Sequence, residues 1–566
     1  MAFNVKNFAD QVRPSPKRPS PEPFDNSVFD AGSPQYVRPE DLFLDIQARL
    51  FGLKPFRAKD LAGIEPSNFR ARWLRDGAPN LQLQRIGHVN NDQLADAVMS
   101  LLRSPQRKNE FHPTLLPVVP TLSYYKNIKA NLPNFLNDQF RPALSFADET
   151  EFAGRTSSLK DKLRNGTPGD TLKELTMSLL RPATSLGYSP LDPDPLPLHV
   201  GPLLKNYSVA PSRPLPVCDS FGEAIDALIS IESLLPRVLW TRWLTATLRL
   251  WLPLFFLKRC TVTAAAAHAA KSSLANSSVV PLPALTDSLL AGRPVLRGSN
   301  EWLNQLAPIV QNYVRGRFEL SILLELSNLY QRLLNQGLDP LNTAHAAKVR
   351  QELDVYEVDS RRANNPSLPP ASGMFSSVKL AMPGDSGAGR LPLNDWLAWL
   401  VANQSSLDAV ARILNTANTV DLIERVYGYI RPDYEPLKSG FGKNALEYVA
   451  FALGAPRKVD RDPEFPDEFN LIYRGEGGRR ARRVLVQPGP QLLALLVQLV
   501  SSQSRRKFGT SAKLSDLLDV FDALGIDFRS NPEDFEGLKL QLLTLGLLQS
   551  SADAAEAASL NPRYSF

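Results

Sequence analysis

Residues 234–259 form the most apolar and aromatic stretch of the chain, and they restrict the fold more than any other segment. The stretch has the sequence LLPRVLWTRWLTATLRLWLPLFFLKR and holds three of the seven tryptophans. A membrane span needs about 20 mostly apolar residues with few charges, and Arg237, Arg242 and Arg249 within this stretch argue against one. We therefore expect a largely buried core helix that is broken at Pro253, in a mainly α protein.

Two of these arginines, Arg242 and Arg249, are seven positions apart and fall on one narrow stripe of the predicted helix. The simplest interpretation is that both arginines extend from a buried helix to solvent or to an acidic partner along this line. Membrane insertion and a functional arginine pair are the alternatives.

The length of 566 residues predicts several domains or one extended helical array. No fixed period is visible, which argues against a regular solenoid without excluding an irregular one. The 64 Lys and Arg outnumber the 58 Asp and Glu by six, a mild excess that suits a nucleic-acid partner. Two cysteines, Cys218 and Cys260, supply neither a disulfide framework nor a zinc set, and the N-terminus has no secretory signal, so we expect a cytoplasmic protein.

Shifts in composition divide the chain into five predicted parts, and proline-rich or polar sequence separates the helical ones. The parts are a disordered Pro-rich tail (1–39), an N-terminal helical domain with a helix-turn-helix candidate (40–215), a central helical core domain (216–350), a flexible linker or insertion (351–393), and a C-terminal helical domain with a basic β-hairpin and a winged-helix-like end (394–566).

Several helix ends are also predicted. Ser220 followed three residues later by Glu223 suits a capping box at the start of a helix. Gly337 and Gly525 each follow an amphipathic run and are expected to end a helix in the left-handed conformation.

Residues 56–77 suggest a helix-turn-helix in which Gly63 ends the first helix, Phe69 takes the core position six residues later, and Trp73 follows four residues after Phe69. The second helix would show Arg70, Arg72 and Arg75 outward, as a basic helix entering the major groove requires. The first helix has Lys59 where such motifs usually have a small residue. Ordinary packing of a short helical hairpin is therefore the competing interpretation.

A second basic cluster lies in residues 468–489, whose alternating pattern and glycine-rich centre predict a β-hairpin or a loop between two strands. Such a loop beside a helical unit could bind phosphates, or it could simply be a solvated charged loop. The five candidate residues are Arg474, Arg479, Arg480, Arg482 and Arg483.

The final residues, 490–566, indicate three helices and a short tail. The first helix ends in Arg505, Arg506 and Lys507, which join the nucleic-acid-binding candidates. The later sequence LLTLGLLQSSADA is similar to the end of a winged-helix domain, where a glycine ends the third helix before a strand of the wing. That third helix is only weakly basic, with Lys539, so the unit could bind protein instead of DNA.

No catalytic motif is found in the chain. The five histidines form no H-x-x-x-H or H-E-x-x-H pattern, and GFGKN at residues 440–444 lacks the spacing and the Ser or Thr of a phosphate-binding loop. We expect no enzymatic activity, no metal or other cofactor, and no small-molecule substrate.

A large helical protein without catalytic motifs, with a weak helix-turn-helix and the C-terminal sequence QPGPQLLALLVQLVSS…LGLL, resembles accessory subunits of multi-gene bacterial anti-phage and DNA-modification systems. The resemblance implies that partner subunits perform the catalysis, while this chain recognises duplex DNA or holds the complex together. Two hypotheses follow, a DNA-binding component and a protein-interaction scaffold without DNA contact. An enzyme with an unrecognised site is the third alternative. No membrane partner is expected.

Overall fold

The structure, a computed structural model, describes about three fifths of the chain and shows a mainly helical protein. The described residues are 4–12, 39–53, 70–71, 73–75, 91–102, 140, 149–165, 171–185, 216–280, 296–298, 302–363, 393–430, 440–454, 467–472, 486–549 and 556–564.

Within these residues, one two-stranded sheet accompanies the helices. In chain order the elements are α1 (Val5–Val12), α2 (Pro39–Phe51), α4 (Asn91–Leu102), α7 (Glu149–Asn165), α8 (Thr171–Ser185), α9 (Pro216–Ser230), α10 (Arg237–Asn276), β1 (Leu296–Arg297), α11 (Trp302–Asn335), α12 (Ala346–Ala363), α13 (Leu393–Ala402), α14 (Gln404–Ile413), α15 (Thr419–Ile430), α16 (Gly440–Ala452), α17 (Pro490–Phe508), α18 (Leu514–Leu524), β2 (Ile526–Asp527) and α19 (Pro532–Thr544), with short 3-10 turns at Glu232–Leu234, Thr343–His345 and Asp467–Phe469.

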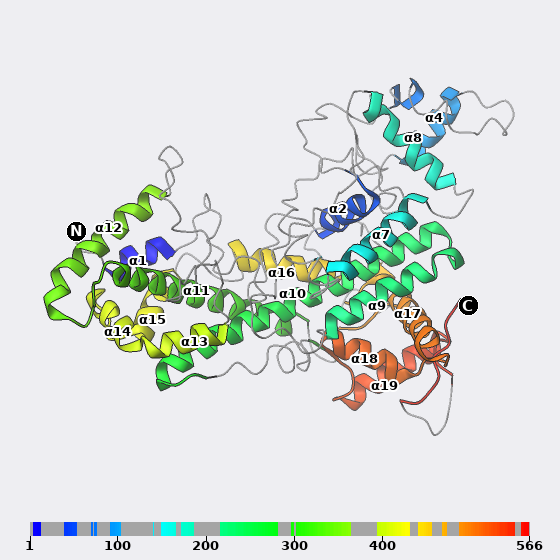
Figure 1. The fold of residues 1–566 in the computed structure, drawn as a ribbon. Helices are drawn as coiled ribbons and strands as arrows, with labels where there is room; N and C mark the ends of the chain where they lie inside the picture. The colour runs from blue at the N-terminus through cyan, green and yellow to red at the C-terminus, as the bar shows by residue number, and fades with distance from the viewer. Residues whose placement is uncertain are drawn as a thin grey trace, which may run out of the picture.

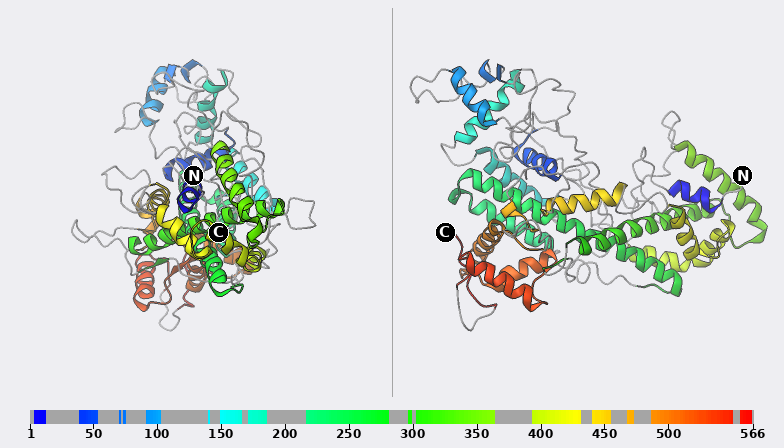
Figure 2. Two further views of the ribbon diagram at one scale, coloured as in Figure 1. Left: turned by 90° about the vertical axis from the view of Figure 1, so that its left-hand side faces the viewer. Right: turned by 180° about the vertical axis from the view of Figure 1, so that it is seen from behind.

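Two long helices, α10 and α11, form the axis of an elongated molecule (Figure 1). The Phe256 ring packs edge-on against Tyr313 at 6.1 Å, and further along both helices Lys271 bonds to Glu319 at 2.9 Å. Residue numbers rise together along the two helices, so they run parallel, and the chain must return between them. The N-terminal helix and the C-terminal helices lie at opposite ends of this axis (Figure 2).

The two long helices approach closely at Gly316. A Cβ placed there would lie 2.9 Å from the Cα of Ala264 and 3.2 Å from the carbonyl oxygen of Thr263. Only glycine fits at this crossing, because any side chain would push the helices apart.

Helix α10 confirms the predicted core helix but not its predicted break. It continues through Pro253 over 40 residues, and of the described helices it is the one long and apolar enough to cross a membrane; 82% of its apolar window is buried by the rest of the protein. Proline in a helix costs about 3 kcal/mol. Burial of Trp251, Phe255 and Phe256, each worth about 1.5–3 kcal/mol, outweighs that cost.

The predicted solvent-facing arginine stripe on α10 is wrong for Arg249, which is buried. Its guanidinium donates to the Asn470 side chain at 3.1 Å and to the Phe451 carbonyl, near the end of α16, at 3.4 Å. Nine residues later the buried Lys258 ammonium donates to the Ala523 carbonyl, near the end of α18, at 2.6 Å. Because helix C-termini carry unpaired carbonyls and partial negative charge, these buried cations hold two other helices on α10.

Helix α9 packs along α10, and its start corrects the predicted capping box. The helix begins at Pro216, so Ser220 lies within it and its hydroxyl accepts a hydrogen bond from the Trp251 indole N–H at 3.3 Å. A second indole, that of Trp240, donates to the Leu228 carbonyl at 2.8 Å. The tryptophans of α10 therefore orient α9 as well as filling the core.

The end of the axis furthest from the C-terminus is built by α1, α12, α14 and α15 around the C-terminal half of α11 (Figure 1). Helix α1 packs on α15 and α12 with Phe8 fully buried, so this part of the predicted disordered tail is folded. The predicted linker 351–393 also begins too early, because α12 continues to Ala363. Gly337 ends α11 with φ of 67°, as expected.

The C-terminal helices form a compact unit with the order helix, extended segment, helix, the short strand β2, helix, and two extended segments. Backbone bonds join Leu514 to Ala558 and Leu560 to Ala512, and on the other side Gln549 to Ser559, at 2.8–2.9 Å. Residues 558–561 therefore lie between 512–514 and 547–549, antiparallel to both. Gly525 ends α18 in the left-handed conformation, as predicted.

Besides the Lys258–Ala523 hydrogen bond, this unit is attached to the helical axis at two points. Strand β2 pairs in parallel with β1, with Leu296 opposite Ile526. The Tyr564 ring packs against Trp243 of α10 at 5.9 Å, and Gln498 makes two hydrogen bonds with the Tyr564 backbone. These joins hold the unit against α9 and α10 and fix which of its faces are outward.

Candidate functional site

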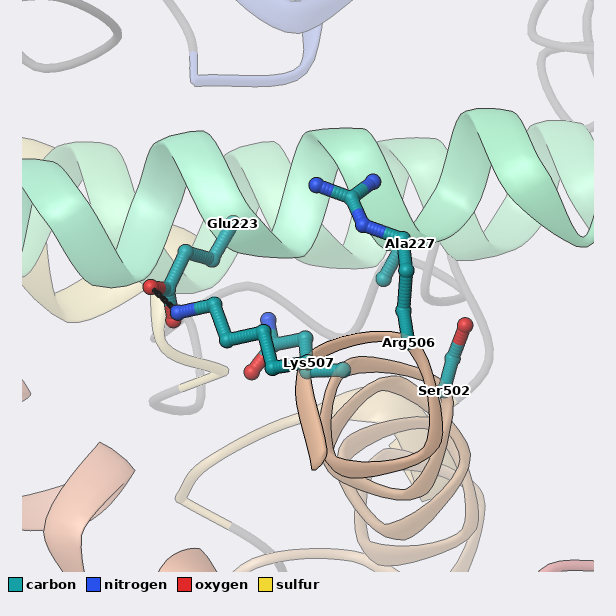
Figure 3. Close-up of a pocket in the computed structure, with 6 residues that line it drawn as sticks. Glu223, Ala227, Ser502, Arg506 and Lys507 are labelled. Carbon is teal, nitrogen blue, oxygen red and sulfur yellow. Dashed lines mark hydrogen bonds and ion pairs between the residues drawn. The ribbon is translucent and has the colours of Figure 1, made fainter. Parts of the chain in front are cut away.

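The basic end of α17, one of the predicted DNA contacts, faces α9 (Figure 3). The Lys507 ammonium forms an ion pair with the Glu223 carboxylate, and an Arg506 nitrogen lies 3.9 Å from an Asp226 oxygen. Arg505 is exposed on the same turn. Two of the three predicted phosphate contacts therefore already face carboxylates of the same chain.

The acidic face of α9 that meets these cations is also held from its other side. Arg155 of α7 binds Asp226 through two hydrogen bonds of 3.1 Å. Burial of Arg155 acts to lower the pKa of its guanidinium, but Asp226 and Glu151 outweigh this effect and keep that pKa above the ordinary value. Partial burial, followed by the charges of Glu223 and Glu151, raises the pKa of Asp219. The cluster joins α7, α9 and α17 electrostatically.

A small cavity opens between α9 and α17, lined by Glu223, Ala227, Ser502, Arg506 and Lys507 among others (Figure 3). Its enclosed space is about 10 Å³, which is about enough for one water molecule. The cavity cannot admit an organic ligand, so the groove is a packing interface with charged edges.

The predicted helix-turn-helix lies mostly outside the described residues, and so does Arg72. Arg70 is described, and its guanidinium bonds to Asp96 at 2.7 Å and Asp92 at 3.5 Å, both on α4. Arg75 is exposed. Trp73 is fully buried and donates to the Ser178 hydroxyl of α8, whereas Phe69, the predicted core residue of the motif, lies outside the described residues.

The five arginines of the second basic cluster, Arg474, Arg479, Arg480, Arg482 and Arg483, all lie outside the described residues. The flanking residues are described, and Ile472 and Gln487 meet in an isolated bridge. This bridge is parallel, whereas the two strands of a hairpin are antiparallel, so the predicted β-hairpin does not extend to these ends. The arginine-bearing segment nonetheless starts and finishes at one fixed point beside α16 and α17.

Helix α19 carries an exposed surface that is not among the predicted sites, all of which are basic clusters. Glu533, Glu536 and Leu540 project outward from it, and the Leu540 side chain is 66% exposed. The opposite side of the helix is anchored, since Leu538 and Leu542 are buried and the Gln541 amide donates to the Pro488 carbonyl at 2.7 Å.

A count of charges along the sequence could have indicated this surface. Residues 510–566 contain nine Asp or Glu against four Lys or Arg, while the whole chain has a charge of +6. The C-terminal unit beyond α17 is therefore acidic, contrary to the polyanion-binding character expected from Arg505, Arg506 and Lys507.

No group of His, Cys, Asp and Glu side chains among the described residues could hold a metal ion. Cys260 is a free, buried cysteine in α10.

The fold and these surfaces define a class: an elongated helical protein with a compact, acidic C-terminal unit. No known protein family, no curated protein and no solved structure matches the chain.

Proposed function

We propose that this chain is a non-catalytic scaffold subunit of a multi-protein assembly, and that its C-terminal unit binds a protein partner. The single observation that supports this proposal best is the exposed acidic and apolar face of α19 at the end of an elongated helical protein. An exposed large apolar residue bordered by charges is typical of protein contact surfaces.

The C-terminal unit has the element order of a winged helix, and we propose that it is one. In that fold the helix at the position of α19 enters the DNA major groove and carries basic or polar residues. Here its outward residues include Glu533 and Glu536, with Lys539 bonded to Glu536 at 3.5 Å. An acidic helix repels phosphates, which favours a protein as the ligand of this unit.

The ion pairs of the predicted DNA contacts support the same proposal. Binding phosphate through Arg506, Lys507 or Arg70 would require breaking bonds to Asp226, Glu223 or Asp96. The resemblance to accessory subunits of bacterial anti-phage systems supplies the setting. In that setting partner enzymes carry out the catalysis in the cytoplasm, and this chain holds them together.

A DNA-binding component of such an assembly is the second candidate function. The observation that favours it is the Ile472–Gln487 bridge, which tethers a 13-residue segment, 473–485, at both ends. That segment contains five arginines and one glutamate. A tethered basic segment loses less conformational entropy when it binds phosphates than a free one does.

Fluorescence anisotropy with duplex and single-stranded DNA, at about 50 and about 200 mM salt, separates the two candidates. The scaffold proposal expects no binding at either salt concentration. Tight binding at low salt that is lost when Arg479, Arg480, Arg482 and Arg483 are all changed to Ala would support the DNA candidate and overturn the scaffold proposal. The matched control changes Arg505, Arg506 and Lys507 to Ala, which removes a basic cluster that already faces carboxylates.

A further inference from the structure

The acidic helix α19 leaves open what kind of protein the C-terminal unit binds. Resting on the scaffold function proposed above, we propose that the outward face of α19 binds a basic protein surface with an apolar socket. The socket receives Leu540, and Lys or Arg side chains around it meet Glu533 and Glu536.

The placement of the outward residues forms one continuous stripe. Glu533, Gly537, Leu540 and Thr544 are spaced by four, three and four residues, so they lie on one side of the helix. All four are exposed, and Glu536 is exposed beside the stripe. Leu540 is, after Phe508, the most exposed large apolar side chain among the described residues.

Nothing in the part of the chain that the structure describes accounts for the exposure of Leu540. The helix is already held by the buried Leu538 and Leu542 and needs no further apolar residue for packing. Burial of one leucine in a partner contributes about 1.5–3 kcal/mol, whereas its exposure to water contributes nothing to folding. Leu540 therefore serves an external contact better than it serves the fold.

The charge around the stripe selects the partner. Glu533 also stabilises the helix N-terminus, as acids in a first turn do. The excess of acids across residues 510–566 is larger than that local role requires, and it gives the part of the unit beyond α17 a negative field. Charge complementarity thus favours a basic partner and disfavours DNA.

Gly537 makes the stripe accessible to a large partner. A Cβ at this position would meet no atom within 4 Å, so the glycine is not required by packing inside the chain. Its absence of a side chain exposes the backbone beside Leu540 and lets another chain approach closely.

The test measures the binding of three labelled peptides to the full-length protein by fluorescence anisotropy. The probe is an amphipathic helical peptide of leucine and lysine. A lysine–serine peptide keeps the charge without the apolar face, and a leucine–glutamate peptide keeps the apolar face with the charge reversed. We expect the leucine–lysine peptide to bind most tightly, and Leu540→Ala to weaken it roughly tenfold. The double variant Glu533→Lys/Glu536→Lys should weaken it at least as much.

Matched control variants exist in the same chain. Leu341, in the turn before α12, is 50% exposed, so Leu341→Ala removes a similar apolar side chain elsewhere. Glu447 pairs with Lys443 on α16 much as Glu536 pairs with Lys539, so Glu447→Lys reverses a similar exposed charge. Both control variants should bind the peptide as the unchanged protein does.

Three outcomes would overturn the proposal. The first is equal binding of the peptide by the Leu540→Ala and Leu341→Ala variants. The second is peptide binding that appears only after Arg479, Arg480, Arg482 and Arg483 are changed to Ala, because the chain's own arginines would then occupy α19. The third is weaker duplex DNA binding by Leu540→Ala, which would make α19 a nucleic-acid contact.

The two proposals fail separately. DNA binding that depends on the arginines, together with peptide binding that depends on Leu540, would overturn the pure scaffold function and keep the docking face. Absence of both DNA and peptide binding would keep the scaffold function and overturn the basic partner.

Discussion

Helices α17 and α19 belong to the same C-terminal unit but present their charge in opposite ways. The basic end of α17 turns inward, where Lys507 and Arg506 face carboxylates of α9. The acidic surface of α19 turns outward with Leu540 beside it. The sequence shows both clusters equally well, and only the fold decides which one is free to meet a partner.

The difference teaches that a run of like charges is a weak guide to a binding site. Ion pairs between exposed groups contribute only a few tenths of a kcal/mol to stability. They nevertheless neutralise the field that a polyanion would experience, and they order the side chains that would have to reach it. Four predictions test how far this contrast between the two helices holds. They are given from the largest expected effect to the smallest.

The two leucines Leu542 and Leu540 of α19 give the largest contrast. Leu542 is fully buried, so Leu542→Ala should lower the free energy of unfolding by about 2–5 kcal/mol. Leu540→Ala should change it by less than about 0.5 kcal/mol, because that side chain is exposed. Chemical denaturation measures both values. Equal losses would mean that Leu540 serves the fold, and the docking face would be lost.

Gly537→Ala should stabilise the protein by about 0.5–1 kcal/mol, because alanine favours a helix and the added methyl meets open space. Gly428→Ala in α15 is the matched control, since a Cβ there also meets nothing within 4 Å. Thermal unfolding should show similar gains for both. Destabilisation by Gly537→Ala alone would show that α19 packs more tightly than its open surface indicates.

The ion-pair network of α10, α11 and α15 supplies a reference for pH dependence. Partial burial acts to raise the pKa of Glu424, but Lys271 and Arg315 outweigh it, so this pKa lies below the ordinary value. A lowered carboxyl pKa contributes stability above the unfolded pKa of about 4.3, and the contribution is lost as the pH falls through the folded pKa.

Glu424→Gln should therefore lower stability at pH 7 by less than about 1 kcal/mol, since the carboxylate is about half exposed. Denaturation curves of the two proteins should differ at neutral pH and converge at acidic pH. A difference that persists at low pH would show that Glu424 acts through packing rather than charge.

The Lys507–Glu223 pair should give the smallest effect. Each side chain is more than a third exposed, so a double-mutant cycle with Lys507→Ala and Glu223→Ala should yield a coupling of about 0.2–1 kcal/mol. The coupling should fall at high salt. A coupling near zero would mean that Glu223 does not hold Lys507, so that Lys507 could bind a polyanion. The contrast between α17 and α19 would then be weaker.

The sequence predicted the helical class, the core helix around Trp243 and Trp251, and the glycines that end α11 and α18. These features depend on local periodicity and on backbone preferences, which the sequence shows directly. Continuation of α10 through Pro253 and the burial of Arg249 depend instead on neighbours hundreds of residues away. No local pattern could reveal that Phe451 and Asn470 would supply acceptors for that arginine.

The candidate site was the harder part for the same reason. Arg505, Arg506 and Lys507 attract attention because they are adjacent in sequence, whereas Glu223 and Asp226 of α9, which face two of them, come from about 280 residues earlier. The α19 stripe is spread over twelve positions, 533–544, and contains no unusual residue. The sequence indicated this stripe only through the net charge of the last 57 residues, which a motif does not take into account.

Because α1 packs on α15, its complete burial has to wait until most of the chain has been synthesised. Phe8 of α1 is buried against elements that end with α15 at residue 430. At about 5–20 residues per second, the ribosome needs roughly 20–80 s to reach that point. Helices α11 and α12, the other partners of α1, are made before α15, so α1 lacks described partners for the earlier part of this interval, and the nascent protein then offers chaperones a defined early binding segment.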